Sequence, residues 1–195
     1  MKKLLITGFD PFGGESINPS WEAVKLLSDR IGAWQLTKLE IPTVFDKAYE
    51  QVLEAARQLQ PDAIVCVGQA GGRSAITPEV VGINLREASI ADNAGNLATG
   101  QSIRADGPAA YFATIPVRDM VAGIRKAELP ANLSYSAGAF VCNDVLYSLL
   151  HYYQDSAVQM GFVHVPFLPQ QAKEGVPSLT LEQIAKGLTA AIEAM

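Results

Sequence analysis

Two cysteines lie in very different surroundings, and only Cys142 is placed where a thiol could act as a nucleophile. Cys66 lies inside the apolar segment "AIVCV", which predicts a buried structural thiol. Cys142 follows the stretch "SAGAFV" and precedes Asn143 and Asp144, which are typical of a first helical turn. We therefore expect Cys142 at a helix N-terminus, where the dipole and free N–H groups favour a thiolate and could bind an oxyanion. A buried packing role is the alternative, because free cysteines are commonly buried.

A cysteine nucleophile needs a base, and the chain offers two histidines. His151 lies about two and a half helical turns beyond Cys142, which is about 13 Å along a helix and out of reach. His164 lies near the end of the predicted strand in "GFVHVPF", where catalytic groups gather in α/β sheets. The alternative for His164 is a satisfied core histidine. Glu79 could orient the imidazole, because it opens an apolar stretch after Pro78 and a buried unpaired carboxylate is costly. Its alternative is an exposed residue at a strand start.

Two Gly-rich turns, "GFDPFGG" and "GQAGGR", follow predicted strands. Neither has the spacing of a dinucleotide-binding or P-loop motif, and both could be tight turns without a ligand. Phe9 and Phe12 bracket the first turn, so their rings could line an apolar pocket for a small ligand.

The composition excludes several classes of function. The chain has 195 residues, a formal net charge of −5 and no run of Lys or Arg, which argues against a nucleic-acid-binding protein. The N-terminal apolar run "LLI" is too short for a signal peptide, and no stretch has transmembrane length, so we expect a cytoplasmic protein without a membrane anchor. Two cysteines without C-x-x-C, and only two histidines, argue against a disulfide framework and a zinc site.

Strands and helices alternate along the chain. Their order, with continuous apolar strands, predicts an α/β fold in which helices cover a mostly parallel sheet. We find no linker or repeat, and we expect one domain over residues 1–195. The segment 91–110 is polar and turn-rich, which predicts a long loop or hairpin near a functional edge. The expected strands are 2–9, 34–42, 62–68, 79–90, 132–140 and 157–169, and the expected helices are 18–31, 44–59, 117–129, 142–154 and 180–195.

Five segments together resemble the pyroglutamyl peptidase type I (pyrrolidone-carboxylate peptidase) family of cysteine peptidases. The resemblance covers almost the whole chain and keeps the order of the segments. It implies a single-domain, three-layer α/β/α sandwich with a mostly parallel (mixed) twisted central sheet. The segments are "ITGFDPFGGESINPSWEA", "VGQAGGRSAITPEVVGIN", "DNAG", "SAGAFVCNDVLY" and "GFVHVPFLPQQ".

The resemblance also implies a reaction, namely removal of an N-terminal pyroglutamyl residue from peptides through a thioester. By resemblance, "AGAFVCN" makes Cys142 the nucleophile, "FVHVP" makes His164 the base, and "TPEVV" makes Glu79 the orienting acid. The implied enzyme needs no metal or cofactor, and members of the family are often homodimers or homotetramers.

Recognition of pyroglutamate follows from the same resemblance. Phe9 and Phe12 are similar to the family's pocket walls, which sandwich the lactam ring, and Gln69 lies near the groups that would bind its polar atoms. An apolar slot without a charged partner would reject free glutamate and ordinary N-terminal amines. The expected partners are therefore peptides with N-terminal pyroglutamate.

Two departures from the family pattern affect residues near the site. The family usually reads "ARIPDN" where this chain has "ASIADN", so Ser89 replaces an arginine, and Arg86 is expected to face the other side. Asp144 stands where histidine is frequent, and an acid there is expected to raise the pKa of the Cys142 thiol. These changes leave two alternatives open, a weakly active or non-catalytic homologue that binds small molecules, and a cysteine hydrolase of another cyclic amide.

Overall fold

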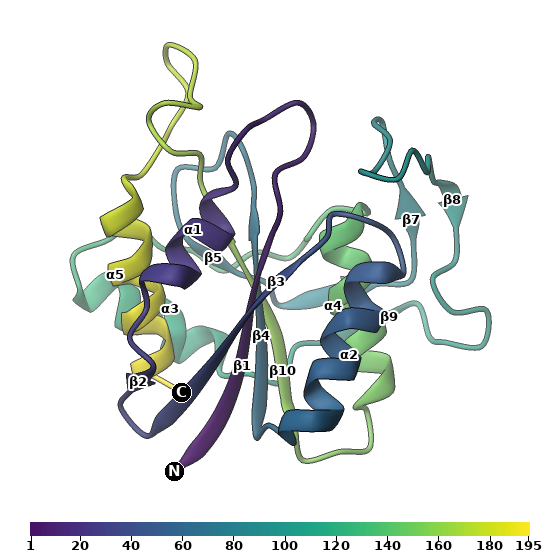
Figure 1. The fold of residues 1–195 in the computed structure, drawn as a ribbon, viewed down its shortest axis with the longest axis horizontal. Helices are drawn as coiled ribbons and strands as arrows, with labels where there is room; N and C mark the ends of the chain where they lie inside the picture. Colours follow the sequence, from purple (N-terminus) through teal and green to yellow (C-terminus); the bar gives the residue numbers. More distant parts are fainter.

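A six-stranded sheet in the order β2-β3-β1-β4-β10-β5 forms the centre of the computed structural model, which describes residues 1–195 (Figure 1). The strands β3, β1, β4 and β10 run parallel, and the edge strands β2 and β5 run antiparallel to their neighbours. This arrangement confirms the predicted mostly parallel, mixed sheet. The strands are β1 (Lys2–Phe9), β2 (Arg30–Ile31), β3 (Trp34–Ile41), β4 (Ala63–Gln69), β5 (Thr77–Pro78) and β10 (Gln159–Val165).

Helices cover both faces of this sheet, as expected for three layers (Figure 1). The strands have two apolar faces, so alternate side chains enter different cores: Leu4 and Ile6 pack with α1, α3 and α5, whereas Leu5 packs with α2 and α4. A capping box formed by Thr180 and Gln183 is present at the start of α5. The helices are α1 (Pro19–Leu26), α2 (Lys47–Leu59), α3 (Val117–Lys126), α4 (Val141–Tyr152) and α5 (Leu181–Glu193). None of them combines the length and apolar character that crossing a bilayer requires.

Three predicted elements differ from the structure. The helix expected over 18–31 ends at Leu26, because the chain turns at Gly32 (φ 55°) and residues 30–31 pair with β3 as β2. The strand expected over 79–90 is broken at Asn84, whose side chain binds the backbone of the following loop. It forms two short strands, β6 (Val81–Ile83) and β7 (Arg86–Glu87), which pair with β9 (Ala110–Phe112) and β8 (Thr99–Gln101).

The strand expected over 132–140 is absent apart from single bridges. Serine hydroxyls there accept hydrogen bonds from nearby backbone N–H groups, from Ser136 to Ser134 and from Gly138 to Ser136. Such local bonds compete with strand pairing, and Gly138 has a positive φ of 78°. The segment therefore bends, and it leads into α4 at the edge of the sheet where the parallel strands end.

Candidate active site

A buried carboxylate–imidazole pair lies at the edge of the sheet. His164 is in β10, and its Nδ1 lies 2.7 Å from Oε1 of Glu79. The short antiparallel strand β5 pairs with β10, with Thr77 opposite His164, and the Glu79 N–H donates to the carbonyl of Phe162 at 2.9 Å. The Glu79 and His164 side chains are 0% and 4% exposed. Two of the proposed catalytic residues, far apart in sequence, are thus held in direct contact.

The electrostatics of this pair fix the direction of the hydrogen bond. Burial alone would raise the pKa of Glu79, but the hydrogen bond and charge of His164, with help from Ser134 and Arg73, lower it overall. Burial lowers the pKa of His164, and Glu79 offsets this only in part. At neutral pH an ionised Glu79 therefore accepts from the Nδ1–H of a neutral imidazole. The other ring nitrogen, Nε2, keeps a lone pair that can accept a proton.

Arg73 is a further member of this cluster, which sequence reasoning treated only as part of a Gly-rich turn. Its Nη1 donates to the same oxygen of Glu79 at 2.7 Å, and its Nη2 donates to the carbonyl of Ser136 at 2.9 Å. The second oxygen, Oε2, is buried and lacks a hydrogen-bond partner. Arg73 and His164 therefore share one carboxylate oxygen, and the positive charge of Arg73 lowers the pKa of His164.

Cys142 reaches the same edge from α4. Its Sγ lies over Gly68 of β4, because a Cβ atom added at Gly68 would be 2.9 Å from the sulfur and 2.7 Å from Cζ of Phe162. Gly68 is the register partner of His164 on the neighbouring strand. No thiol–imidazole hydrogen bond is formed in this structure, and such bonds commonly tighten only when substrate binds. A glycine at the end of an apolar strand often marks a place where another group approaches the backbone closely, and at Gly68 that group is the Cys142 sulfur.

The expectation that the helix start favours a thiolate is wrong. Burial, followed by the negative charge of Glu79, raises the pKa of Cys142 to about 12, and burial also raises the pKa of Cys66 to about 12. Burial is the largest cause of both shifts. The two thiols differ in access, because Cys66 is 1% exposed whereas Cys142 is only half-buried. Cys142 is thus a protonated thiol in a residue that is only half-buried.

The expectation that Asp144 raises the pKa of Cys142 is wrong, because the charge that raises it most is that of Glu79. The buried carboxylate of Asp144 turns away from the thiol and accepts from Nε of Arg86 at 2.7 Å. Arg86 binds Asp144 and Asp46, in agreement with the prediction that it faces the other side. Ser89 is exposed. His151, at the far end of α4, is also apart from the thiol, and its Nδ1 lies 2.9 Å from the Tyr111 hydroxyl.

The first turn of α4 offers unpaired N–H groups. Phe140 is the N-cap and provides no side-chain cap, so the N–H groups of residues 141–143 have no acceptor within the helix. Asn143 fixes the helix start, because its Oδ1 accepts from the Ile83 N–H and its Nδ2 donates to the carbonyls of Ile83 and Leu85 at 2.9–3.0 Å. The turn can therefore present N–H donors to an oxyanion beside Cys142.

The two turn aromatics occupy different positions. Phe9 is 2% exposed and packs on Phe162 with ring centroids 6.1 Å apart. Phe12 is half-buried and packs on Phe140, also at 6.1 Å. Phe162 in turn lies 4.7 Å from the imidazole ring of His164. Phe9 thus lies beneath the site, whereas Phe12 and Phe140 form a wall beside Cys142.

Gln69 lies at the end of β4, one residue beyond Gly68. Its carbonyl oxygen accepts from Nε2 of Gln171 at 3.0 Å, and Gln171 also donates to the carbonyl of Ile17 at 3.2 Å. The amide of Gln69 is therefore held with its N–H₂ group free to donate.

The "DNAG" motif has a structural role at this edge. Asp92 accepts from the N–H groups of Asn96 and Phe45 at 2.8 Å and 3.0 Å. Asn93 donates to Oδ1 of Asp10 at 3.2 Å. These bonds tie the loop after residue 91 to the loops that follow β1 and β3.

Comparison with known proteins places the chain among one group of enzymes. A family model described as pyroglutamyl peptidase matches residues 2–195. The chain is 50% identical over 198 residues to the pyrrolidone-carboxylate peptidase of Staphylococcus saprophyticus, covering 99% of this chain and 92% of the relative. It is also 50% identical to the enzyme of that name from Levilactobacillus brevis, covering 99% and 97%.

Solved structures agree with these sequence matches. The crystal structure of Bacillus amyloliquefaciens pyroglutamyl peptidase I superimposes with a TM-score of 0.96 at 47% identity, covering 100% of this chain and 96% of that chain. The pyrrolidone carboxyl peptidase of Thermococcus litoralis gives a TM-score of 0.94 at 34% identity, covering 100% and 93%.

Proposed function

Because the chain belongs to the pyroglutamyl peptidase family, we propose that it removes N-terminal pyroglutamyl residues from peptides, with Cys142 as nucleophile. His164 acts as base and Glu79 as the acid that orients it. The observation that carries these roles is the buried Glu79–His164 pair beside Gly68, the residue over which the Cys142 sulfur lies. The same observation favours this function over a non-catalytic homologue.

The reaction follows from the protonation states. The Cys142 proton passes to Nε2 of His164 as sulfur attacks the pyroglutamyl carbonyl carbon, giving a tetrahedral oxyanion at the start of α4. The carbon–nitrogen bond then breaks, and the imidazolium gives its proton to the leaving amine. His164 next takes a proton from water, whose oxygen attacks the thioester carbon. The carbon–sulfur bond breaks, and free pyroglutamate leaves as the thiol is restored.

Selectivity for the lactam follows from what lies around the thiol. Phe12 and Phe140 offer an apolar wall, Phe9 supports the floor of the site, and the free N–H₂ of Gln69 can donate to the ring carbonyl. The buried charge of Glu79 is already paired with Arg73 and hydrogen-bonded to His164, so it is not available to a substrate ammonium group. A charged N-terminal amine would therefore be buried without a partner. No cavity in the structure is lined by Cys142 or His164, so we expect the two wall rings to separate as the lactam enters.

The enzyme acts, in this proposal, as one domain over residues 1–195, in the cytoplasm, as a homodimer or homotetramer and without a metal or cofactor. A single sheet that uses strands from residue 2 to residue 165 supports the one-domain assignment.

Cleavage of fluorogenic aminoacyl-coumarins tests the proposal directly. The reduced protein should release coumarin from the pyroglutamyl derivative and leave the prolyl and glutamyl derivatives intact, because only the first is a neutral lactam. Absence of cleavage of the pyroglutamyl derivative would contradict the proposal. Turnover of another cyclic amide in its place would support the alternative hydrolase.

Replacing Arg73 by methionine is expected to shift the acidic limb of the kcat/KM–pH profile to higher pH. The charge of Arg73 lowers the pKa of His164, so its removal raises that pKa and leaves less neutral imidazole in acid. Activity should therefore fall more at about pH 6 than at about pH 8. Arg73→Lys keeps the charge and is the matched control. An acidic limb that stays in place or moves to lower pH would contradict this role.

A further inference from the structure

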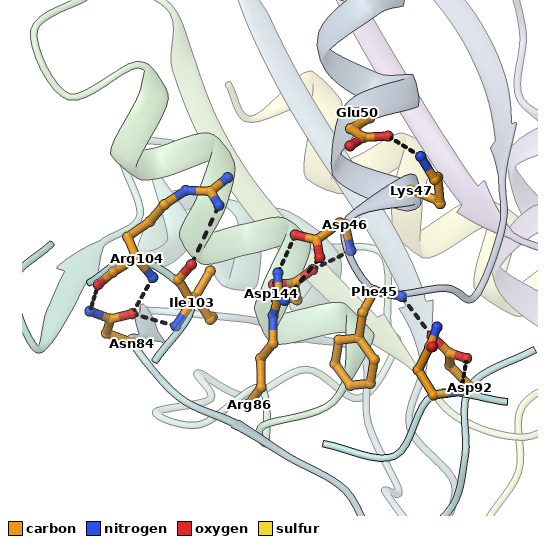
Figure 2. Close-up of polar contacts among 11 residues, drawn as sticks. Phe45, Asp46, Lys47, Glu50, Asn84, Arg86, Asp92, Ile103, Arg104 and Asp144 are labelled. Atoms are coloured by element: carbon orange, nitrogen blue, oxygen red, sulfur yellow. Dashed lines mark hydrogen bonds and ion pairs between the residues drawn. The ribbon is translucent and has the colours of Figure 1, made fainter. Parts of the chain in front are cut away.

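Asp144, Arg86 and Asp46 form an ion cluster at the start of α4 (Figure 2), in which Asp144 is buried and the Asp46 side chain is 48% exposed. Asp144 is 0% exposed, and it accepts from Arg86 through Oδ1 at 2.7 Å and from the Asp46 N–H through Oδ2 at 3.1 Å. Arg86 also donates to both carboxylate oxygens of Asp46, through Nη1 at 3.0 Å and through a shorter bond from Nη2. One guanidinium thus joins the start of α4 to the loop between β3 and α2.

The loop held by this cluster has a strained backbone. Asp46 has φ 61° and ψ −45°, a region that L-residues rarely occupy. The Lys47 N–H donates to the carbonyl of Phe45 at 2.7 Å, which closes a three-residue γ-turn of the rare, positive-φ kind. Such a turn persists only where its surroundings hold it. Here both the carboxylate and the N–H of Asp46 are bound by the cluster.

The turn places one aromatic ring. Phe45 is buried, and the Arg86 guanidinium lies over its ring at 5.5 Å from the centroid. The rings of Phe45 and Phe140 form a T-shaped pair with centroids 5.4 Å apart and an interplanar angle of 86°, and Phe140 packs on Phe12. A continuous row of contacts therefore leads from the ion cluster to the wall beside Cys142.

We propose that Arg86, Asp46 and Asp144 act as a positioning clamp that fixes Phe45 and, through it, the Phe140 wall of the pyroglutamyl site. This inference rests on the proposed function and adds specificity residues to it. The clamp governs how well the lactam ring is held, and it leaves the reactivity of the thiol unchanged, because Asp144 faces away from Cys142. It also assigns a role to an aspartate that stands where the family frequently has histidine.

Arg86→Met tests the clamp by removing both ion pairs. KM for the pyroglutamyl-coumarin should rise by about tenfold, with kcat within about twofold, because ring binding is lost rather than chemistry. The rate of alkylation of Cys142 by iodoacetamide, which needs no ring pocket, should stay within about twofold of wild type. Arg104→Met is the matched control, since Arg104 lies 5.1 Å over Tyr49 of the same helix α2 without touching the cluster.

Two further variants separate the parts of the clamp. Phe45→Leu keeps the ion pairs and should give the same rise in KM. If Arg86→Met does not fold, the KM of Phe45→Leu alone tests whether Phe45 positions the wall. Adding Asp46→Gly to Arg86→Met should recover part of the affinity, because glycine adopts a positive φ without support.

Several results would overturn the clamp. These are an unchanged KM in both Arg86→Met and Phe45→Leu, an equal rise in KM in Arg104→Met, or a fall in kcat and in alkylation rate at constant KM. No recovery on adding Asp46→Gly would overturn the assignment of strain to the turn. Wild-type turnover in the same assay distinguishes failure of the clamp from failure of the proposed function, since a wild type that does not cleave overturns both.

Discussion

Replacing Cys142 by serine is expected to lower kcat/KM for a pyroglutamyl peptide by about 10³-fold or more, while the fold is kept. A serine hydroxyl is a weaker acid and a poorer nucleophile than a thiol, and its smaller oxygen atom would not occupy the position of the sulfur. The initial rate of coumarin release measures the loss, and circular dichroism checks the fold.

Cys66→Ser is the matched control for this change. Cys66 is buried in β4 and takes no part in the proposed reaction, so its variant should keep kcat/KM after correction for the folded fraction. Full activity in Cys142→Ser, or loss of activity only in Cys66→Ser, would contradict the assignment of the nucleophile. Alkylation gives a second check, because a thiol with a pKa of about 12 should react faster as the pH rises past 9 rather than level off near neutrality.

Replacing Gly68 by alanine is expected to have the second largest effect. The added methyl group would lie 2.9 Å from the Cys142 sulfur and 2.7 Å from Phe162, closer than such atoms pack. The thiol must then move away from the strand that carries His164, and we expect kcat/KM to fall by about 10²-fold, as for other small misplacements of reacting groups. Overpacking should also lower the free energy of unfolding by about 1–3 kcal/mol.

Gly161→Ala separates these two effects. Gly161 lies on the adjacent strand β10, and a Cβ there would meet Cδ1 of Ile115 at 2.0 Å, away from the thiol. It should therefore destabilise the protein at least as much, as measured by urea denaturation, yet keep the activity per folded molecule. Equal activity losses in Gly68→Ala and Gly161→Ala would show that Gly68 acts only through stability.

The order of strands and helices could be predicted from the sequence because it depends on local apolar patterns. The parallel strands and the position of His164 near the end of its strand follow from such patterns. The broken segment 79–90 and the absent strand at 132–140 were not predicted, because hydrogen bonds from Asn84 and from serine hydroxyls replace ladder pairing there.

The proposed site was harder to predict where its side chains contact residues that are far away in the sequence. Nothing local shows that Arg73 shares the carboxylate of Glu79, or that Phe162 and the strands bury the thiol enough to raise its pKa. The orientation of the Asp144 side chain, by contrast, could have been deduced from the sequence. Residues two apart on a helix do not face each other, so an acid at position 144 points away from a thiol at position 142.

The place of β10 in the sheet has a consequence for synthesis of the chain. β10 is the last strand in sequence, yet it lies between β4 and β5, and it carries the imidazole that binds Glu79, 85 residues earlier. Pairings across such long sequence separations are slow to form, because the intervening chain must first be closed into a loop. A nascent chain whose residues up to 165 have not yet left the ribosome therefore lacks His164, which is the proposed base and the hydrogen-bond partner of Glu79. Hydrolytic activity accordingly reports that the final strand has been inserted, which makes turnover a sensitive probe of refolding.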